Sequence, residues 1–402
     1  MENHIAAQIL ITFGGLFLLG LIADLVGRHT PLPRVTLLLL SGFVIGPSVL
    51  DLLPSFTDQW FPVLTNIALA MIGFMLGQKM TRITFRNLGR AVFGMSVGVV
   101  LTTVFMIFIV LFLFGVPFEI ALLLAGISTA TDPAATIDVV REYQAKGRFT
   151  DTLLGIVAID DVLGLLLFSL ISVVVQSVGG QVGAVHIFAT AGWEIGGAVL
   201  LGVLLGLPMA YLSGRILPGE ATQAEALGLV LLCTGLAVWF EVSYLLAAMV
   251  LGAVVANFSK HCDRPFHAIE GVEWPFLILF FLLAGAALHL DSIGQVGLLG
   301  VGYISLRVAG RIMGGWIGGL IGKTDLQMSR WMGIALLPQA GVAIAMVLLA
   351  SQRFPELGDI LLPIILGSTV IFELIGPVLT RQSLFRVGNI LPHPNQVSTE
   401  KP

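Results

Sequence analysis

The sequence predicts an all-α polytopic membrane protein with thirteen transmembrane helices, and three observations support this fold class. Of the 402 residues, 57% are hydrophobic and only 11% are charged, whereas soluble chains average about 25% charged residues. The apolar residues form continuous runs of about 20 residues, the length that an α-helix needs to cross a bilayer. Basic residues gather in every second loop between these runs. This composition excludes a soluble enzyme, a nucleic-acid-binding protein and a disordered chain.

The predicted helices follow the apolar runs in chain order. The first run has no basic segment before it, so we interpret it as a true span and not as a cleaved signal peptide. The 47 glycines suit helices that pack closely in lipid. The predicted spans cover residues 5–26, 35–53, 62–78, 91–114, 119–141, 150–177, 187–213, 221–240, 243–257, 274–290, 295–321, 327–351 and 356–379.

The distribution of Lys and Arg predicts how the chain is oriented. Every Lys and Arg except Arg307, Arg311 and Arg353 lies in an odd-numbered loop or in the C-terminal tail. Because cytoplasmic loops carry the excess of basic residues, we expect the N-terminus outside and the C-terminus in the cytoplasm. The tail, residues 380–402, is short and contains no Gly-rich phosphate loop. We therefore expect no cytosolic nucleotide-binding domain and no cofactor.

The strongest functional signal is a set of six ionisable residues deep inside the predicted spans, where a charge costs several kcal/mol and marks function by default. When all are ionised, four carboxylates and two guanidinium groups leave two negative charges in excess. Such an excess in a low-dielectric interior requires bound protons or bound cations. A carboxylate that can bind either a proton or a cation, but not both, is what a proton–cation exchanger requires. The six residues are Asp132, Asp160, Asp161, Glu373, Arg307 and Arg311.

Two interpretations of these charges remain open. Arg307, Arg311 and Glu373 are explained equally well as ion pairs that lock helices together, because pairing alone would satisfy them. Asp160 and Asp161 differ from these, since adjacent carboxylates repel each other and bring no gain in packing. About ten residues of helix place them roughly 15 Å into the sixth span, near the midplane. The two aspartates therefore favour a functional site.

Two predicted spans contain a signal that starts a helix in the middle of the membrane. In Thr131-Asp132-Pro133, the proline suits the first helical position and the aspartate is a good N-cap residue. Pro338-Gln339 interrupts the twelfth span in a similar way. The fifth and twelfth spans run in opposite directions. This arrangement favours an inverted-repeat fold with two crossed discontinuous helices and a binding site at the bilayer midplane.

Four motifs make the chain resemble the monovalent cation/proton antiporters of the sodium/proton exchanger superfamily. The resemblance extends from the second span to the thirteenth. The double aspartate is similar to the bacterial branch that includes the Kef-type potassium systems and the thirteen-span sodium/proton antiporters. The motifs are Thr131-Asp132-Pro133, Asp160-Asp161, Gly310-Arg311-Ile312-Met313-Gly314 and Phe372-Glu373-Leu374-Ile375-Gly376-Pro377.

The resemblance implies a homodimer in which one domain moves like an elevator. Residues 1–78 and 220–290 would form the dimerisation domain. Residues 91–178 and 293–379 would form the core ion-translocation domain, and residues 187–213 a linker helix between them. The resemblance also implies a location in the bacterial cytoplasmic membrane.

The same resemblance implies roles for individual residues. Asp161 would bind the ion and carry the proton, while Asp132 and Thr131 would line the crossing point of the broken helices. Asp160 would pair with Arg311, where many relatives with two aspartates have lysine. Gln339 stands where some relatives carry a charged residue.

Charge pattern and resemblance together predict a secondary active antiporter that exchanges protons for Na⁺ or K⁺. Asp161 and Asp132 would hold the monovalent cation, the bilayer would surround the protein, and no nucleic acid is expected as a partner. The alternative is a sodium-coupled symporter of an organic solute, because other inverted-repeat folds also contain crossed broken helices. The core has few polar groups beyond its charges to recognise such a solute, which favours antiport. The sequence does not distinguish Na⁺ from K⁺.

Overall fold

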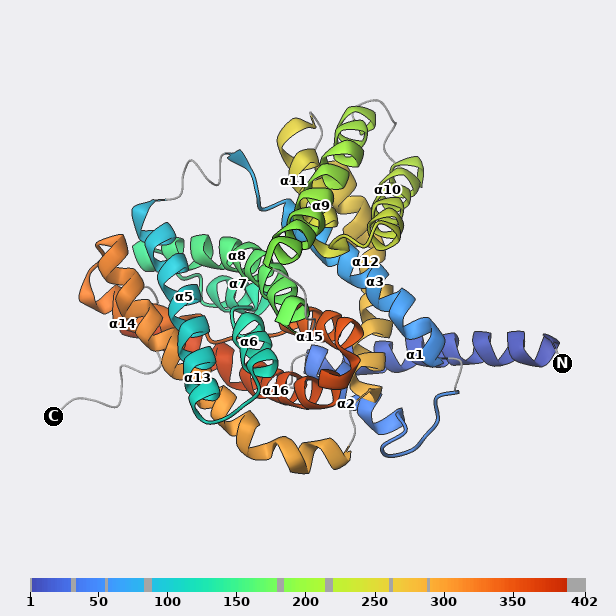
Figure 1. The fold of residues 1–402 in the computed structure, drawn as a ribbon, viewed down its shortest axis with the longest axis horizontal. Helices are drawn as coiled ribbons and strands as arrows, with labels where there is room; N and C mark the ends of the chain where they lie inside the picture. Colours follow the sequence, from blue (N-terminus) through green and yellow to red (C-terminus); the bar gives the residue numbers. More distant parts are fainter. Residues whose placement is uncertain are drawn as a thin grey trace. The chain divides into compact units, whose positions relative to one another are not determined.

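The computed structural model describes residues 2–29, 34–54, 57–82, 89–178, 184–213, 220–259, 263–287 and 290–388. These residues form α-helices joined by short connections, and no β-strand occurs among them (Figure 1). Eight of the helices are long and apolar enough to cross a membrane, judged by length and composition. The prediction of an all-α, multi-pass membrane protein is confirmed for this part of the chain.

The helices keep the order of the predicted spans. In chain order they are α1 (Glu2–His29), α2 (Arg34–Ile45), α3 (Thr57–Gly77), α5 (Arg90–Leu113), α6 (Phe118–Ile127), α7 (Pro133–Glu142), α8 (Arg148–Val178), α9 (Ala184–Leu212), α10 (Glu220–Trp239), α11 (Tyr244–Phe258), α12 (Asp263–Ala286), α13 (Leu290–Gly322), α14 (Leu326–Ala335), α15 (Gly341–Arg353) and α16 (Pro355–Arg386).

Three helices have an end that differs from the predicted one by seven or more residues. α2 stops at Ile45 and not at 53, because Gly46 and Pro47 follow and proline cannot continue a helix. α12 begins at Asp263 and not at 274, and α16 continues to Arg386 and not to 379. Apolar runs mark the part of a helix that lies in the membrane, whereas its polar first and last turns extend beyond that part. Residues 389–402 of the predicted tail lie outside the described residues.

The prediction that the fifth and twelfth spans are broken is confirmed. The fifth span consists of α6 and α7, and residues 128–132 between them are not helical. The twelfth span consists of α14 and α15, and residues 336–340 between them are not helical. Pro133 begins α7, and Pro338 and Gln339 lie inside the second break.

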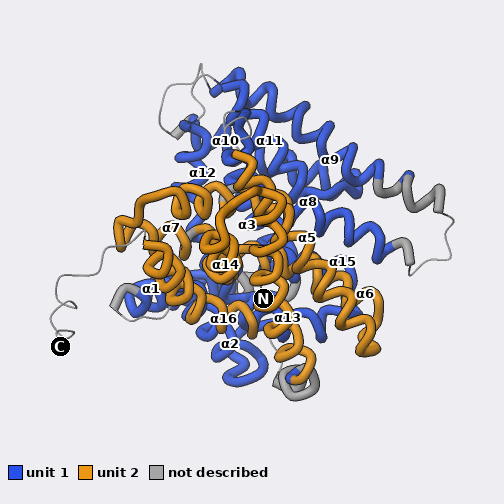
Figure 2. The backbone as a smooth tube through the Cα atoms, turned by 90° about the vertical axis from the view of Figure 1, so that its left-hand side faces the viewer, with its two compact units in different colours: residues 1–86, 165–297, 344–366 blue, residues 87–164, 298–343, 367–402 orange. Residues whose placement is uncertain are grey.

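The chain divides into two compact units, shown in blue and orange in Figure 2. Unit 1 comprises residues 1–86, 165–297 and 344–366, and unit 2 comprises residues 87–164, 298–343 and 367–402. Accordingly α1 to α3 and α9 to α12 belong to unit 1, whereas α5, α6, α7 and α14 belong to unit 2. Four helices, α8, α13, α15 and α16, contribute residues to both units. The division into a dimerisation domain and a mobile core stays a prediction.

Glycines bring helix backbones into contact within unit 1. A Cβ atom on Gly252 of α11 would collide with the main-chain oxygen of Phe74 in α3. In the same way, a Cβ atom on Gly285 of α12 would collide with the main-chain oxygen of Leu39 in α2. Small residues of this kind let helices approach closely where no water drives them together. These glycines therefore allow the close helix packing that the glycine-rich composition predicts.

Unit 2 has an apolar core to which α5, α7, α8, α14 and α16 contribute. Leu153, Ile156 and Val157 of α8 belong to this core, and they come directly before Asp160. The second broken helix contributes the last turn of α14. The core residues are Met95, Val99, Val139, Val140, Ala145, Phe149, Leu153, Ile156, Val157, Met328, Met332, Ala335, Leu336 and Leu384.

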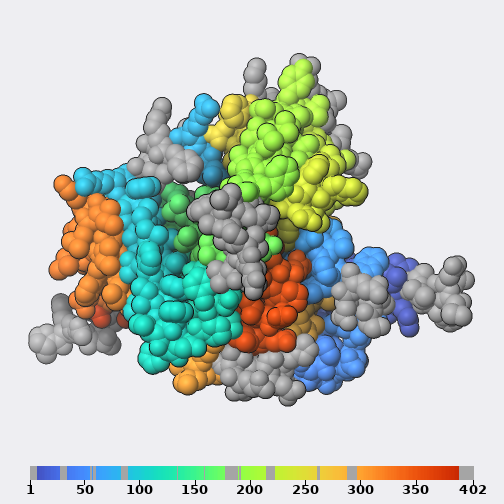
Figure 3. All heavy atoms as spheres, in the orientation of Figure 1, coloured from blue at the N-terminus to red at the C-terminus, as the bar shows by residue number. Residues whose placement is uncertain are grey.

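Large apolar side chains remain exposed on the outside of unit 2. Phe105, Phe112 and Leu113 of α5 are 57%, 51% and 77% exposed. The space-filling view shows α5 and α6, in cyan and teal, at the surface of the molecule (Figure 3). Exposed aromatic and aliphatic side chains along a whole helix are typical of a face that contacts lipid.

Candidate functional site at two helix breaks

The first break arises from local sequence signals. The Ser128 and Thr129 hydroxyls donate to the main-chain oxygens of residues 125 and 126, at 2.6 and 2.7 Å. Such local bonds offer the backbone an alternative to continuing the helix. Pro133 then starts α7, and the carboxylate of Asp132 accepts a hydrogen bond from the N–H of Ala135 at 3.3 Å. Asp132 is therefore the N-cap of α7, as its position before the proline predicts.

The second break lies in direct contact with the first. Proline has no N–H group and disfavours the helical conformation of the residue before it, so Pro338 prevents α14 from continuing. The main-chain oxygen of Pro338 accepts a hydrogen bond of 3.0 Å from the N–H of Asp132. α16 approaches the same proline closely, because a Cβ atom on Gly376 would lie 2.7 Å from the Pro338 Cα. The two breaks thus form one connected segment inside unit 2.

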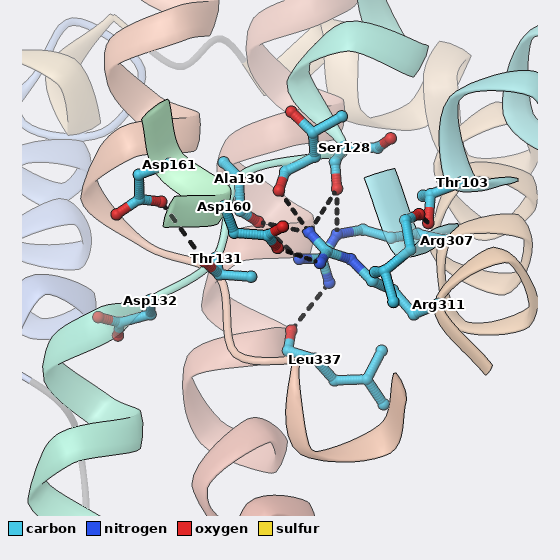
Figure 4. Close-up of polar contacts among 12 residues, drawn as sticks. Thr103, Ser128, Ala130, Thr131, Asp132, Asp160, Asp161, Arg307, Arg311 and Leu337 are labelled. Carbon is cyan, nitrogen blue, oxygen red and sulfur yellow. Dashed lines mark hydrogen bonds and ion pairs between the residues drawn. The ribbon is translucent and has the colours of Figure 1, made fainter. Parts of the chain in front are cut away.

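Arg307 of α13 holds both breaks together. Its Nε donates to Ser128 O at 3.2 Å and its Nη2 to Ala130 O at 2.9 Å, while its Nη1 donates to Leu337 O at 2.8 Å (Figure 4). The guanidinium also lies 4.3 Å from the ring centre of Phe372 in α16, within cation–π distance. The side chain has no exposed surface. A planar fork with five N–H groups suits this arrangement, in which acceptors come from two separate segments.

Arg311, one turn further along α13, joins the first break to α8. Its Nη1 donates to the Asp160 carboxylate at 2.8 Å, and both side chains are completely buried. Its Nη2 lies 2.5 Å from Thr129 O and 3.2 Å from both Ser128 O and Ala130 O. The predicted contact between Asp160 and Arg311 is therefore present. Because a buried charge must be paired and hydrogen-bonded, each partner stabilises the other here.

Asp161 and Asp132 lie on the other side of the first break from the arginines (Figure 4). Asp161 is completely buried, and the Thr131 hydroxyl donates to its Oδ1 atom at 3.4 Å. Asp132 is half-buried at the start of α7. This side of the break therefore presents two carboxylates and one hydroxyl, which are the oxygen ligands that a hard cation prefers.

The structure brings most of the predicted site residues into this one region of unit 2. Glu373 follows Phe372 in α16 and is 3% exposed, and Gln339 in the second break is completely buried. Sequence reasoning missed that three main-chain oxygens of the first break are ligands of the arginines. It also missed Tyr303, a completely buried polar side chain of α13. This residue lies four positions before Arg307 and hence on the same face of the helix.

Sequence reasoning also missed an ion pair in unit 1. The Arg353 guanidinium at the end of α15 lies 2.5 Å from the Glu194 carboxylate in α9, and their side chains are 25% and 3% exposed. The signal was available, because Arg353 is the one basic residue predicted in an even-numbered loop and Glu194 is a lone acidic residue in an apolar run. Matching these two isolated opposite charges would have predicted the pair.

Replacing Arg353 by methionine should destabilise the protein more than replacing Glu194 by glutamine. The first change leaves a buried carboxylate without its cation, whereas the second leaves a half-exposed cation beside an amide oxygen. Breaking a fully buried pair costs ~3–5 kcal/mol, and the exposed fraction of Arg353 places the effect below that range. Thermal unfolding in detergent, followed by tryptophan fluorescence, measures both. Equal shifts would contradict the expectation, because leaving either partner unpaired would then cost the same. The double variant should recover part of the loss.

Two discontinuous helices that meet inside a multi-pass helical fold, with buried carboxylates beside the meeting point, define a membrane transporter built around broken helices. The chain belongs to the sodium/hydrogen exchanger family of transmembrane proteins, whose family model matches residues 14–385.

Curated relatives and solved structures agree with this assignment. The chain is 19% identical to the K⁺/H⁺ antiporter subunit KhtU of Bacillus subtilis, over 94% of each chain. It is 21% identical to the ammonium/H⁺ antiporter subunit AmhT of Alkalihalophilus pseudofirmus, over 85% of this chain and 86% of the relative. It is 23% identical to the Na⁺/H⁺ antiporter NhaH of Halobacillus dabanensis, over 88% and 91%. The structure of the sodium proton antiporter MjNhaP1 from Methanocaldococcus jannaschii at pH 8 shares the fold, with a TM-score of 0.69 at 19% identity over 94% and 96% of the chains.

Proposed function

We propose that the protein is a secondary active antiporter that exchanges protons for a monovalent cation, Na⁺ or K⁺, across the bacterial cytoplasmic membrane. The observation that carries this proposal is the group of oxygen ligands at the first break, where Thr131 contacts the buried Asp161 and Asp132 begins α7. The names of the relatives support proton-coupled cation antiport and do not favour a symporter of an organic solute.

In this proposal the mechanism is competition for one carboxylate. Asp161 binds either a proton or a cation, and the cation also takes the Thr131 hydroxyl and the Asp132 carboxylate as ligands. Binding of the cation expels the proton, because a buried carboxylate with both would carry an uncompensated charge. Asp160 stays out of the exchange, since its carboxylate already accepts from Arg311. Thirteen spans, the inverted repeat, the outside N-terminus, the homodimer and an elevator movement of the core belong to the same proposal.

Purified protein in proteoliposomes tests the proposal. A pH gradient is formed, with the lumen acidic and a pH-sensitive dye inside, and then NaCl, KCl or choline chloride is added outside. We expect Na⁺ or K⁺ alone to raise the luminal pH, with no response to choline or in vesicles without protein. No response to either cation unless an organic solute is present would favour the symporter instead. Comparison of Na⁺ with K⁺ at equal concentration identifies the substrate.

The exchange should be electroneutral, with one proton for one cation. A guanidinium stays protonated in proteins, so Arg311 holds Asp160 ionised throughout the cycle. Asp161 is then the single carboxylate that alternates between proton and cation. Initial exchange rates in proteoliposomes should therefore be equal at clamped membrane potentials of either sign. Rates that follow the potential, or a sustained cation-driven current on a solid-supported membrane, would show that Asp160 also titrates.

A further inference from the structure

Several completely buried side chains of unit 2 have polar atoms that make no hydrogen bond to the described residues, and three of these side chains carry no charge and lie on α13, α16 and the second break. They are the Tyr303 hydroxyl, both amide atoms of Gln339 and the Thr369 hydroxyl. Thr369 is unusual even within its own helix. In α16 the hydroxyls of Thr380 and Ser383 donate to main-chain oxygens four residues earlier, as polar side chains in apolar helices commonly do. The Thr369 hydroxyl makes no such bond.

Helix register brings Tyr303 next to Gln339. α13 and α14 run antiparallel, because Gly315 approaches Gly333 and Arg307, two turns earlier in α13, donates to Leu337 O. One further turn back in α13 is Tyr303, whose side chain therefore faces the chain just beyond Leu337. The Tyr303 hydroxyl lies close to the Gln339 side chain, but the two do not meet the geometry of an ordinary hydrogen bond.

The register of α16 brings Thr369 to the level of Tyr303 and Gln339. α16 also runs antiparallel to α14, because Thr380 donates to Ala335 O and Gly376 packs against Pro338. α16 is therefore parallel to α13, and Phe372 of α16 covers the Arg307 guanidinium. Thr369 precedes Phe372 by one turn, just as Tyr303 precedes Arg307 by one turn. The register of the three elements thus puts Tyr303, Gln339 and Thr369 at one level of unit 2, the level next to Arg307.

The chemistry of these groups selects their ligand. Buried polar atoms without partners are unfavourable. Each hydroxyl can donate and accept a hydrogen bond, and the amide has two donor hydrogens and one acceptor oxygen. A ligand that satisfies these groups must therefore both donate and accept hydrogen bonds. A cation is opposed by the adjacent Arg307 charge, which acts strongly in a low-dielectric interior. An anion would face the Gln339 amide oxygen and the main-chain oxygens that Arg307 binds. Water meets every requirement, since buried waters typically make about three hydrogen bonds to such groups.

We propose that Tyr303, Gln339 and Thr369 form a pocket that binds an internal water molecule beside the crossing of the two broken helices. The water satisfies the Gln339 amide and so supports the backbone of the second break. Gln339 directly follows Pro338, whose oxygen holds the N–H of Asp132. The three residues therefore act as positioning residues for the break, and they do not touch the transported ion.

Radiolytic hydroxyl-radical labelling of the unmodified protein tests the pocket. Radicals formed from an internal water modify the side chains that touch it, even when bulk solvent does not reach them. We expect Tyr303 to be modified in proportion to dose, despite its complete burial. Met95 and Met332 are the controls, because their sulfur atoms react more readily but lie fully buried in the apolar core. Tyr303 as unreactive as these methionines would overturn the proposal, and equal labelling of all three would show general opening and overturn it too.

Variants give a second test with a predicted sign. Tyr303→Phe and Thr369→Val each remove one hydroxyl and little volume. In a dry pocket these changes remove an unsatisfied group and raise the melting temperature, whereas in a hydrated pocket they remove a partner of the water and lower it. We expect a lower melting temperature for both, and several-fold weaker labelling of Tyr303 in Gln339→Leu. A higher melting temperature for both single variants would show a dry pocket and overturn the proposal.

Discussion

Asp161→Asn is expected to reduce proton–cation exchange to the level of protein-free vesicles while the protein remains folded. The carboxamide cannot be ionised, so it can neither release a proton nor carry the negative charge that a cation requires. Folding should be retained, because the substitution removes a buried charge and conserves the shape of the side chain. The measurement combines dye-based exchange in proteoliposomes with thermal unfolding of the same preparation.

The matched control for this variant is Asp151→Asn. Asp151 lies on the same helix, α8, but its side chain is exposed in the first turn. The substitution is chemically identical and should leave exchange unchanged. Appreciable exchange in Asp161→Asn would assign the proton to another carboxylate, with Asp132 the next candidate. Loss of exchange in both variants would point to a general effect on α8.

Arg311→Met is expected to lower the free energy of unfolding by ~3–5 kcal/mol, the usual cost of breaking a buried ion pair. The change leaves the Asp160 carboxylate, which has no exposed surface, without its cation. Asp160→Asn combined with Arg311→Met should recover much of this loss, because the stranded charge is then absent. Thermal or denaturant unfolding of the purified variants measures the effect.

Arg307→Met is the matched control. Arg307 is equally buried and hydrogen-bonded, but its acceptors are uncharged main-chain oxygens. Arg307→Met loses these hydrogen bonds but leaves no carboxylate without its ion-pair partner. Asp160→Asn should therefore not restore the stability of this variant. Equal rescue of both variants by Asp160→Asn would mean that Asp160 interacts as strongly with Arg307 as with Arg311, and the assignment of the ion pair would be wrong.

The parts of the fold that depend on local signals could be predicted from the sequence. Asp is a favoured N-cap residue and Pro a favoured first helical residue, so Asp132 and Pro133 together predict the first break and its N-cap. Pro338 acts in the same way in the second break. The ends of α12 and α16 could not be predicted, because hydropathy follows the membrane and their polar turns continue outside it.

The partners of the arginines could be predicted only in part. Asp160 was predicted as the partner of Arg311 from the family resemblance, and the structure contains this contact. The oxygens of Ser128, Thr129 and Ala130 could not be predicted, because a main-chain oxygen is the same at every residue and only the folded backbone shows which ones are free. The roles of Asp161, Asp132 and Thr131 in exchange remain predictions.

The contacts of the two arginines with main-chain oxygens also affect how this site can evolve. An interaction with a carbonyl group survives almost any change in the side chain that the residue carries. Residue 130 can therefore vary among small side chains that preserve the path of the backbone, and Ser128 and Thr129 can vary among side chains that keep the hydroxyl, while Arg307 and Arg311 cannot be replaced without loss. Selection should act on identity at the arginines, Thr131 and Asp132, on the hydroxyl at residues 128 and 129, and only on size and backbone conformation at residue 130. Saturation mutagenesis of this segment would thus show exchange between serine and threonine at residues 128 and 129, a choice of small side chains at residue 130, and no tolerated change at Thr131.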